Sequence, residues 1–378
     1  MKVLLLVQGQ LDRRLGGPRL PMDLASGLRA QGVSVAVESA DTLRQKTHAL
    51  PGEPWEVLLG RYVEAHGSFD VLDFDHLPFP LDPAQIPIRL SVARVSLLLL
   101  HLADMRLPDD PRPLVRMKKA LQPWRYRWQQ EGQIRETAET LRRAGGVMVN
   151  NHRDAARLGQ LGLDPRQVAV VLPGCVQAER AALEAVAARP KARPPVIAFV
   201  GTFDFRKGCL DLVKMFERLS AAIPGVRLRL LGTKGLFQTE AEVRGFFPAR
   251  LRAQLEVHPQ FSPEALPGLL ADASLGLFPS YLESFGYGAL EMMHAGLPVL
   301  AYDVPGPSEF VPHAQLFAAG DVAGMVARAV ALLKTPDLLP AVLSAQAGEV
   351  QNLSAEQHAA RTLEVYAHWL RHDTAPHG

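Results

Sequence analysis

The chain has 378 residues, 48% of them hydrophobic, and its formal net charge is +2 at pH 7. This length suffices for two domains of ordinary size, and the composition excludes a disordered chain. The near-neutral charge gives no footprint for nucleic acid, and two cysteines, Cys175 and Cys209, are too few for a disulfide scaffold or a zinc cluster. We therefore expect a globular protein of a reducing cytoplasm, without a nucleic-acid partner.

Two apolar runs are too short to be a signal peptide or a membrane span. The N-terminal run Lys2–Val7 is too short for a signal peptide, and no small-residue cleavage site follows it, so a buried first strand is the better interpretation. The run from Val95 to Ala103 is interrupted by His101 and is too short to span a bilayer.

Strand and helix patterns alternate along the chain, which predicts an α/β protein with parallel sheets covered by helices on both faces. The first half is expected to contain the helix Leu20–Gln31 and the strands Lys2–Val7, Val33–Glu38, Asp70–Phe74, Arg94–Leu100, Gly146–Asn150 and Gln167–Leu172. The expected strands of the second half are Val196–Gly201, Arg227–Leu231, Leu255–His258, Leu275–Phe278 and Pro298–Tyr302. Its expected helices are Leu210–Ala222, Pro263–Ala271, Gly288–Ala295, Val322–Lys334 and Ser354–Arg371.

This pattern predicts two doubly wound, Rossmann-like domains facing a central cleft. The first is expected at 1–172 and the second at 196–353. The stretch 173–195, rich in Ala, Pro, Arg and Lys, is expected to connect them, and 354–378 to form a terminal helix. Ligands of open α/β sheets bind beyond the carboxyl ends of the strands, so we expect the binding residues in the strand-to-helix loops.

The most informative loop carries two carboxylates, Glu283 and Glu291, eight positions apart. A strand ends at Phe278, glycines follow at Gly286 and Gly288, and a helix then starts. The helix N-terminus between the carboxylates offers free N–H groups and a positive dipole end, both of which favour a phosphate. The structural alternative is an ordinary strand–loop–helix unit with two solvated glutamates.

These residues resemble the E-x7-E segment of the retaining glycosyltransferase family 4, which has the GT-B fold. The resemblance implies that Glu283 lies near the sugar of a nucleotide-diphosphate donor and that Glu291 contacts the ribose. It also implies that Phe285 and Gly286 supply backbone N–H groups, and that the terminal helix packs back across both domains.

A second loop, from Gly201 to Gly208, contains Arg206 and Lys207. A lysine provides a compact charge and an arginine a bidentate fork, and both suit a diphosphate. The resemblance assigns Lys207 to the leaving diphosphate. The family usually has an arginine where this chain has Thr202, and Arg206 is the candidate to supply that charge. Exposed loop cations are the structural alternative.

The resemblance implies three further candidates for the predicted site. Gly232 ends another strand and is expected to border the nucleotide. Gly17, in a Gly-Gly pair between the first strand and helix, is expected to approach the donor from across the cleft, although a flexible connection explains it equally. His101, placed at a strand end, is expected to contact the sugar, against the alternative of a structural histidine; His76 and Asp104 are weaker candidates.

Two further motifs, an acidic pair and a basic aromatic stretch, do not identify a binding site by themselves. Asp73 and Asp75 imitate the D-x-D metal motif of the other major glycosyltransferase fold, a reading we reject because enzymes of the resembled fold use basic residues and a helix N-terminus. We expect no metal. The basic, aromatic stretch Arg112–Arg127 is compatible with peripheral contact to the inner membrane face or a phosphorylated acceptor, and also with a plain exposed segment.

The resemblance implies a retaining hexosyltransferase that moves a sugar from a UDP- or GDP-sugar to an acceptor hydroxyl of a glycan, lipid-linked sugar or small molecule. No further cofactor is required. Two alternatives stay open: another GT-B enzyme, such as a nucleotide-sugar epimerase or a phosphorylase, and a degenerate binding subunit without turnover.

Overall fold

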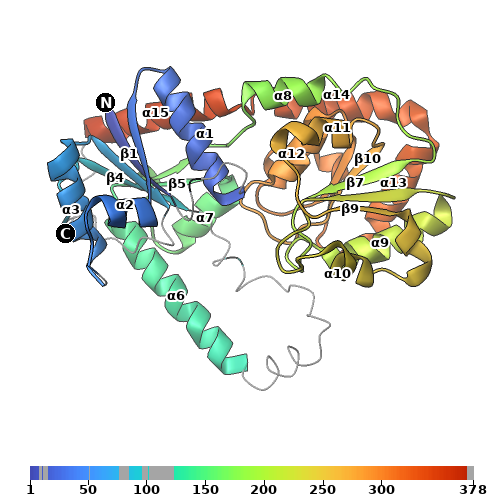
Figure 1. The fold of residues 1–378 in the computed structure, drawn as a ribbon, viewed down its shortest axis with the longest axis horizontal. Helices are drawn as coiled ribbons and strands as arrows, with labels where there is room; N and C mark the ends of the chain where they lie inside the picture. Colours follow the sequence, from blue (N-terminus) through green and yellow to red (C-terminus); the bar gives the residue numbers. More distant parts are fainter. Residues whose placement is uncertain are drawn as a thin grey trace. The chain divides into compact units, whose positions relative to one another are not determined.

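The protein forms two compact units (Figure 1). A computed structural model describes residues 1–7, 11, 16–50, 52–75, 85–95, 101 and 123–372. The N-terminal unit comprises Met1–Leu99, Trp124–Val176 and Leu353–Gly378. The C-terminal unit comprises Leu100–Pro123 and Gln177–Asn352. The unit boundaries fall after Leu99, Pro123, Val176 and Asn352, and helix α8 (Gln177–Glu184) lies within the stretch expected to be a connection.

The N-terminal unit is built on a six-stranded parallel sheet with the strand order β2-β1-β3-β4-β5-β6. Its strands are β1 (Lys2–Val7), β2 (Ser34–Ser39), β3 (Val71–Asp75), β4 (Leu90–Val95), β5 (Gly146–Val149) and β6 (Val168–Val170). Its helices are α1 (Gly16–Ala30), α2 (Ala40–Lys46), α3 (Trp55–His66), α6 (Pro123–Arg143), α7 (His152–Gln160), the short η2 (Pro165–Gln167) and α15 (Ala355–His372).

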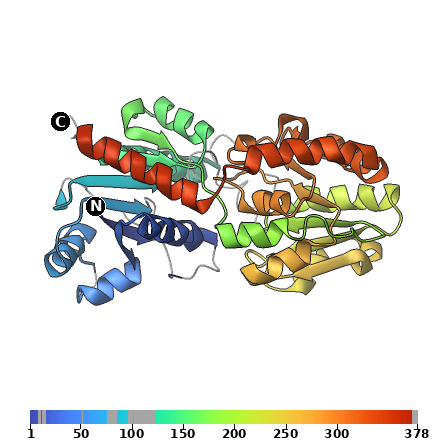
Figure 2. The same cartoon turned by 90° about the horizontal axis from the view of Figure 1, so that it is seen from above.

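The last helix of the chain, α15, belongs to this N-terminal core and packs against α1. Figure 2 shows α15 as the red helix that ends beside the C label. A Cβ atom added at Gly27 of α1 would lie 2.6 Å from the Ala359 side chain, so small residues let the two helices approach closely. The Trp369 ring covers Gly146 at the start of β5 in the same way.

The C-terminal unit contains a second six-stranded parallel sheet with the order β12-β11-β10-β7-β8-β9. Its strands are β7 (Val196–Val200), β8 (Arg227–Leu231), β9 (Leu255–His258), β10 (Leu275–Phe278), β11 (Val299–Tyr302) and β12 (Leu316–Phe317). Besides α8, its helices are α9 (Cys209–Ala222), α10 (Glu240–Gly245), α11 (Leu266–Leu270), α12 (Tyr287–His294), α13 (Val322–Lys334) and α14 (Leu339–Val350). Its short 3-10 helices are η3 (Ala249–Gln254), η4 (Pro263–Ala265), η5 (Pro307–Glu309), η6 (His313–Gln315) and η7 (Pro336–Leu338).

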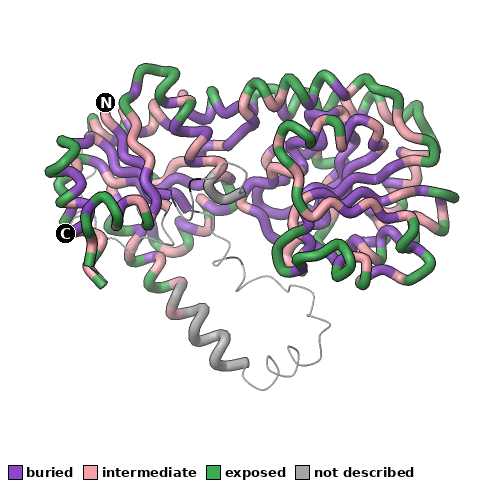
Figure 3. The backbone as a smooth tube through the Cα atoms, in the orientation of Figure 1, coloured by how far each residue is buried: buried purple, intermediate pink, exposed green. Residues whose placement is uncertain are grey.

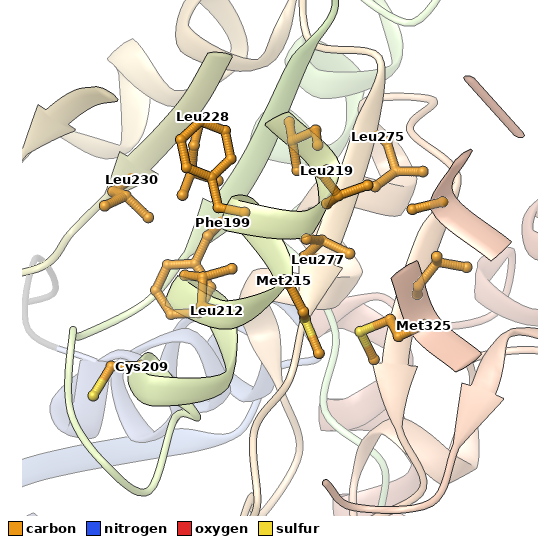
Figure 4. Close-up of a cluster of buried hydrophobic side chains, with 14 of the residues drawn as sticks. Phe199, Cys209, Leu212, Met215, Leu219, Leu228, Leu230, Leu275, Leu277 and Met325 are labelled. Atoms are coloured by element: carbon orange, nitrogen blue, oxygen red, sulfur yellow. The ribbon is translucent and has the colours of Figure 1, made fainter. Parts of the chain in front are cut away.

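Helices cover both faces of this second sheet. Alternate strand residues, among them Phe199 and Leu277, join side chains of α9 and α13 in one buried cluster (Figure 4). On the other face, a Cβ atom at Gly276 of β10 would lie 2.8 Å from the Met292 sulfur of α12. Burial on both faces explains why the central strands β7, β10 and β11 are continuous apolar runs, and why Figure 3 shows the sheet buried between more exposed helices.

The prediction of an α/β protein with two Rossmann-like sheets is confirmed. Two local predictions are wrong. The strand expected at Arg94–Leu100 is β4, which begins at Leu90, because Val92 pairs with Asp73 and Arg94 with Asp75. The glycine pair at Gly16 and Gly17 forms the start of α1 instead of a loop. Residues 96–100 lie outside the described residues.

Candidate functional site

The strand order of the C-terminal unit creates a switch point at β7. The chain proceeds from β7 to β8 and β9 on one side and then returns to β10, β11 and β12 on the other. At such a point the loops that leave two adjacent parallel strands diverge to opposite faces, which makes room for a ligand at the carboxyl edge. Helix α9 follows β7 and α12 follows β10, and these two helices cover opposite faces (Figure 1). Both predicted donor-binding loops therefore start from this edge.

The loop between β7 and α9 is held in shape by Asp204. Its carboxylate accepts hydrogen bonds from the Lys207 backbone N–H at 2.9 Å and from the Thr202 hydroxyl at 2.6 Å. The Cys209 N–H donates to the Asp204 carbonyl at 3.2 Å. These bonds fold residues 201–208 into a compact turn, and Lys207 and Arg206 project from it.

The turn ends at Gly208, whose positive φ of 75° suits a glycine. A Cβ atom at this position would stand 1.9 Å from the carbonyl oxygen of Pro279 in the next loop. The glycine is therefore required both by its own backbone conformation and by the close approach of a second segment.

The two loops are joined by hydrogen bonds and by an ion pair. The Lys207 ammonium pairs with the Glu283 carboxylate, and these side chains are only 15% and 7% exposed. The Arg206 guanidinium donates to the Leu282 carbonyl at 3.1 Å, and the Tyr281 N–H donates to the Arg206 carbonyl at 2.8 Å. The structure thus brings together Lys207, Arg206 and Glu283, three of the residues predicted for the site.

The charges around the ion pair are nearly balanced. The Arg206 guanidinium lies 3.8 Å from the Asp204 carboxylate, and the Lys207 ammonium lies 5.5 Å from the centre of the Phe278 ring, within range of a cation–π contact. A lysine has three N–H donors, and Glu283 accepts one of them. The ammonium therefore keeps the capacity to donate to an anionic oxygen at the same edge.

The start of helix α12 lies at the same edge of the sheet. Gly286, the residue before it, has a φ of 102°, and no side chain caps the helix. A Cβ atom at Gly288 would lie 2.3 Å from the Val200 carbonyl at the end of β7, so the first turn of α12 is packed tightly against the β7 strand. Phe285 is buried and its ring packs on Phe310, 5.1 Å between centroids. Glu291 is buried one turn further into α12.

The remaining predicted residues lie in varied positions. Gly201 follows β7 and Gly232 follows β8, where Phe261 packs 3.1 Å from the position of a Cβ atom on Gly232. Gly17 belongs to the N-terminal unit. His101 has helical backbone and is partly buried, so the prediction that it ends a strand is wrong. His76, Asp104 and residues 112–122 of the basic stretch lie outside the described residues.

The acidic pair that imitates a metal motif has a structural explanation. Asp73 is completely buried in β3, forms an ion pair with Arg94 of β4 and accepts a hydrogen bond from the Tyr366 hydroxyl of α15. Arg94 also lies 3.9 Å from the Asp75 carboxylate. These contacts attach α15 to the N-terminal sheet.

Sequence reasoning missed several residues that shape the site. Asp204 stands three positions before Lys207, a spacing that allows a side-chain carboxylate to cap a tight turn, and this signal was available. Gly306 lies in a turn that resembles a glycine turn of the family, but its contact is visible only in the fold: a Cβ atom there would lie 2.4 Å from the Phe285 carbonyl. This glycine after β11 therefore lets the chain approach the backbone of the β10–α12 loop closely.

Comparison with known proteins connects this geometry to a family. Residues 184–348 match the model of the glycosyl transferases group 1. This match covers the switch point and both of its loops, so the resemblance to glycosyltransferases is confirmed for the C-terminal unit. None of the helices among the described residues is both long and apolar enough to cross a membrane.

Curated relatives match part of the chain. A D-inositol 3-phosphate glycosyltransferase of Nocardia farcinica is 32% identical over 178 residues, 44% of this chain and 40% of the relative. A glycogen synthase of Mycobacterium tuberculosis is 32% identical over 153 residues, 40% of this chain and 36% of the relative. The chain spans about half the length, or less, of the curated relatives it matches.

Solved structures match nearly the whole chain. Sucrose-phosphate synthase from Thermosynechococcus elongatus superposes with a TM-score of 0.68 and 18% identity, over 98% of this chain and 99% of that one. Anabaena HepE in complex with UDP and glucose superposes with a TM-score of 0.65 and 17% identity, over 97% and 99%. At these identities the likeness shows the fold, and the predicted GT-B fold is confirmed.

Proposed function

Starting from a C-terminal unit that matches the glycosyl transferases group 1, we propose that this protein is a retaining hexosyltransferase that uses a nucleotide-diphosphate sugar. The observation that carries the proposal is the Lys207–Glu283 ion pair at the switch point of the sheet. It joins a cation suited to a diphosphate and a carboxylate suited to sugar hydroxyls. In a nucleotide-diphosphate sugar the diphosphate is bonded directly to the sugar, so the residues that bind the diphosphate and the sugar must lie next to each other.

In the proposed reaction the bond between the anomeric carbon and the diphosphate oxygen breaks, and an acceptor oxygen bonds to the same face of that carbon. The acceptor proton passes to an oxygen of the departing diphosphate. Charge that builds up on the diphosphate is stabilised by the Lys207 ammonium and by the N-terminus of α12. No second carboxylate is needed for a covalent intermediate in this scheme.

The family resemblance supplies proposed roles for the other residues. Glu283 orients the sugar hydroxyls, and Glu291 binds the ribose from one turn inside α12. Arg206 supports the loop through Leu282 and adds positive charge near the diphosphate. We assign the acceptor to the N-terminal unit and His101 to the sugar. UDP is the first nucleotide to test, because the structural relative HepE is described with UDP.

A thermal-shift screen tests the donor site. Wild type is heated with UDP, GDP, ADP and dTDP and their sugar conjugates, and each ligand's shift is measured against the same protein without ligand. We expect one nucleotide to raise the midpoint selectively, by mass action on the folded state. Lys207→Ala should lose that shift, while Lys334→Ala, which removes an exposed lysine of the last turn of α13, should keep it. No shift with any nucleotide would reject the proposal.

A second candidate function is a binding subunit without turnover. It is favoured by Thr202, which stands where the resembled family usually has an arginine and whose hydroxyl bonds to Asp204. A nucleotide sugar that binds to wild type but releases no nucleotide, with water or with a panel of sugar acceptors, would favour this candidate. Release of free sugar or an epimer without any acceptor would instead indicate another GT-B activity.

A further inference from the structure

A buried carboxylate connects helix α9 to the loop that carries Glu283. Asp211, in the first turn of α9, is 2% exposed. Its Oδ2 atom accepts hydrogen bonds from the hydroxyls of Tyr281 and Tyr302, the latter at 2.9 Å. The Lys214 ammonium donates to the Oδ1 atom at 3.0 Å. None of these residues has a role in the proposed reaction.

Both tyrosines act as donors to this carboxylate. Burial raises the pKa of each phenol above its ordinary value, and the hydrogen bond with the negatively charged Asp211 raises it further. The hydroxyls therefore stay protonated at neutral pH, and an O–H donor directed at a carboxylate forms one of the stronger classes of hydrogen bond. The two rings also contact each other edge to face, 5.3 Å between centroids.

The two hydroxyls are attached to different kinds of backbone. Both rings belong to the same buried cluster, but Tyr302 is the last residue of β11, and its backbone is fixed by pairing with Phe317 of β12. Tyr281 lies in the loop after β10, two residues before Glu283. The same carboxylate oxygen therefore accepts from two tyrosines whose backbones are held differently. The backbone of Tyr302 is held by the sheet, and that of Tyr281 depends on loop contacts.

We propose that Tyr281 is a positioning residue, whose hydroxyl bond to Asp211 holds Glu283 against Lys207 in the arrangement needed to bind the sugar of the donor. This inference rests on the proposed function for its consequence, and on the described contacts for its geometry. The backbone of the loop is attached to Arg206 through the Tyr281 N–H and the Leu282 carbonyl. The Asp211 bond adds an attachment to the first turn of α9, which begins directly after Lys207 and Gly208.

The proposal predicts different effects for two chemically identical substitutions. Tyr281→Phe and Tyr302→Phe each remove one oxygen atom, and each leaves Asp211 Oδ2 with the other hydroxyl as a partner. If both hydroxyls only stabilise the core, the two variants should behave alike. If Tyr281 positions the loop, only its variant should loosen residues 279–286.

Amide hydrogen exchange, measured without ligand in wild type and in both variants, compares the two tyrosines. The Tyr281 amide, which donates to the Arg206 carbonyl, is the reporter. We expect it to exchange roughly tenfold faster or more in Tyr281→Phe, because a bond to a charged acceptor no longer opposes local opening. Its rate in Tyr302→Phe should stay within about twofold of wild type. Equal acceleration in both variants, or none in either, would overturn the positioning role.

Donor binding supplies the second measurement. With UDP and UDP-glucose as probes, the Kd for UDP should be unchanged in Tyr281→Phe, whereas the Kd for UDP-glucose should rise roughly tenfold. Tyr302→Phe should match wild type for both. Parallel loss of both ligands in Tyr281→Phe would overturn the assignment to the sugar. If wild type bound neither probe but the difference in exchange rate were observed, the role of Tyr281 in holding the loop would be supported. The proposed function with a UDP-sugar donor would then be rejected.

Discussion

A buried ion pair is rarely a strong source of stability, and Lys207 and Glu283 illustrate the point. Both side chains lose most of their hydration, and this cost offsets much of their attraction. Replacing both with apolar residues of similar size is often neutral for the fold. The proposed donor site gives these charges a function instead. Among the described residues, the Lys207 ammonium donates to Glu283, which leaves it further N–H donors for an anion, and Glu283 keeps lone pairs for hydroxyl groups.

Glu291 allows a test of ribose recognition at the level of a single group. If its carboxylate accepts hydrogen bonds from the ribose hydroxyls, Glu291→Gln should weaken UDP binding roughly tenfold, since bonds to a charged acceptor contribute about 1.5–3 kcal/mol. Isothermal titration of wild type with UDP and 2′,3′-dideoxy-UDP measures the contribution of the hydroxyls directly. The variant should bind the dideoxy ligand as wild type does. An affinity for UDP equal to wild type would contradict the role given to Glu291.

At the scale of elements, the site is made from two loops that depend on each other. The β7–α9 loop ends at a glycine because the β10–α12 loop passes too close for a side chain. The second loop is in turn fixed to the first through Arg206 and to α9 through Asp211. Asp204 folds the first loop internally, whereas the second loop depends on its contacts with the first loop and with α9.

Gly208→Ala tests this dependence. The substitution adds the cost of a left-handed residue, about 1–2 kcal/mol, and a collision with the Pro279 carbonyl. We expect urea denaturation to show a loss of at least about 2 kcal/mol, with weakened nucleotide binding. The matched control is Gly348→Ala in the interior of α14, where a Cβ atom meets nothing within 4 Å and should stabilise the helix by up to about 1 kcal/mol. Equal stabilities for the two variants would mean that the loops move apart at little cost.

At the scale of the whole molecule, each unit contains a histidine that is buried in its neutral form. Burial lowers the pKa of His294 in α12 to about 4, with the Arg180 charge contributing, although the Glu184 carboxylate 3.6 Å away opposes the shift. Burial also lowers the pKa of His358 in α15 to about 4, and the Arg94 charge adds to this. The His358 Nδ1–H donates to the Leu172 carbonyl at 3.1 Å, and its Nε2 atom has no hydrogen-bond partner among the described residues.

The two histidines predict a loss of stability in acid. An unfolded histidine takes up a proton near pH 6.5, whereas the folded residue resists protonation until about pH 4. Their contribution is therefore fully present above about pH 6.5 and is lost as the pH falls towards 4, at up to about 1.4 kcal/mol per pH unit for each histidine. Urea denaturation at pH 7 and pH 5 should show this decrease.

Variants separate these histidines from the carboxylates that also titrate in acid. His358→Asn keeps a donor for the Leu172 carbonyl but does not titrate, so its unfolding free energy should fall by roughly 2 kcal/mol less than that of wild type between pH 7 and pH 5. His368→Asn changes a histidine on a less buried face of the same helix and should retain the wild-type pH dependence. Identical pH dependence in His358→Asn and wild type would contradict the neutral state of His358.

The sequence by itself determined most of the secondary structure of the C-terminal unit. The strands Arg227–Leu231, Leu255–His258 and Leu275–Phe278 and the helix Val322–Lys334 have the bounds that the sequence predicted. The signals for these bounds are local: Gly232, Pro259 and Pro279 directly follow the three strands, and the helix has apolar residues at helical spacing. The same kind of signal, with the E-x7-E resemblance, selected Glu283, Glu291 and Lys207.

Tertiary structure decided what the local signals did not contain. Apolar periodicity placed a strand on Arg94–Leu100, whereas pairing of β3 with β4 places it at Leu90–Val95, because burying Arg94 requires Asp73 beside it. The Lys207–Glu283 pair joins residues 76 positions apart, and the Asp211–Tyr281 bond joins residues 70 apart. Contacts of this range follow from the strand order, which brings the ends of β7 and β10 together. Sequence therefore proposed the chemical groups of the candidate site, and only the folded sheet determined which of them meet.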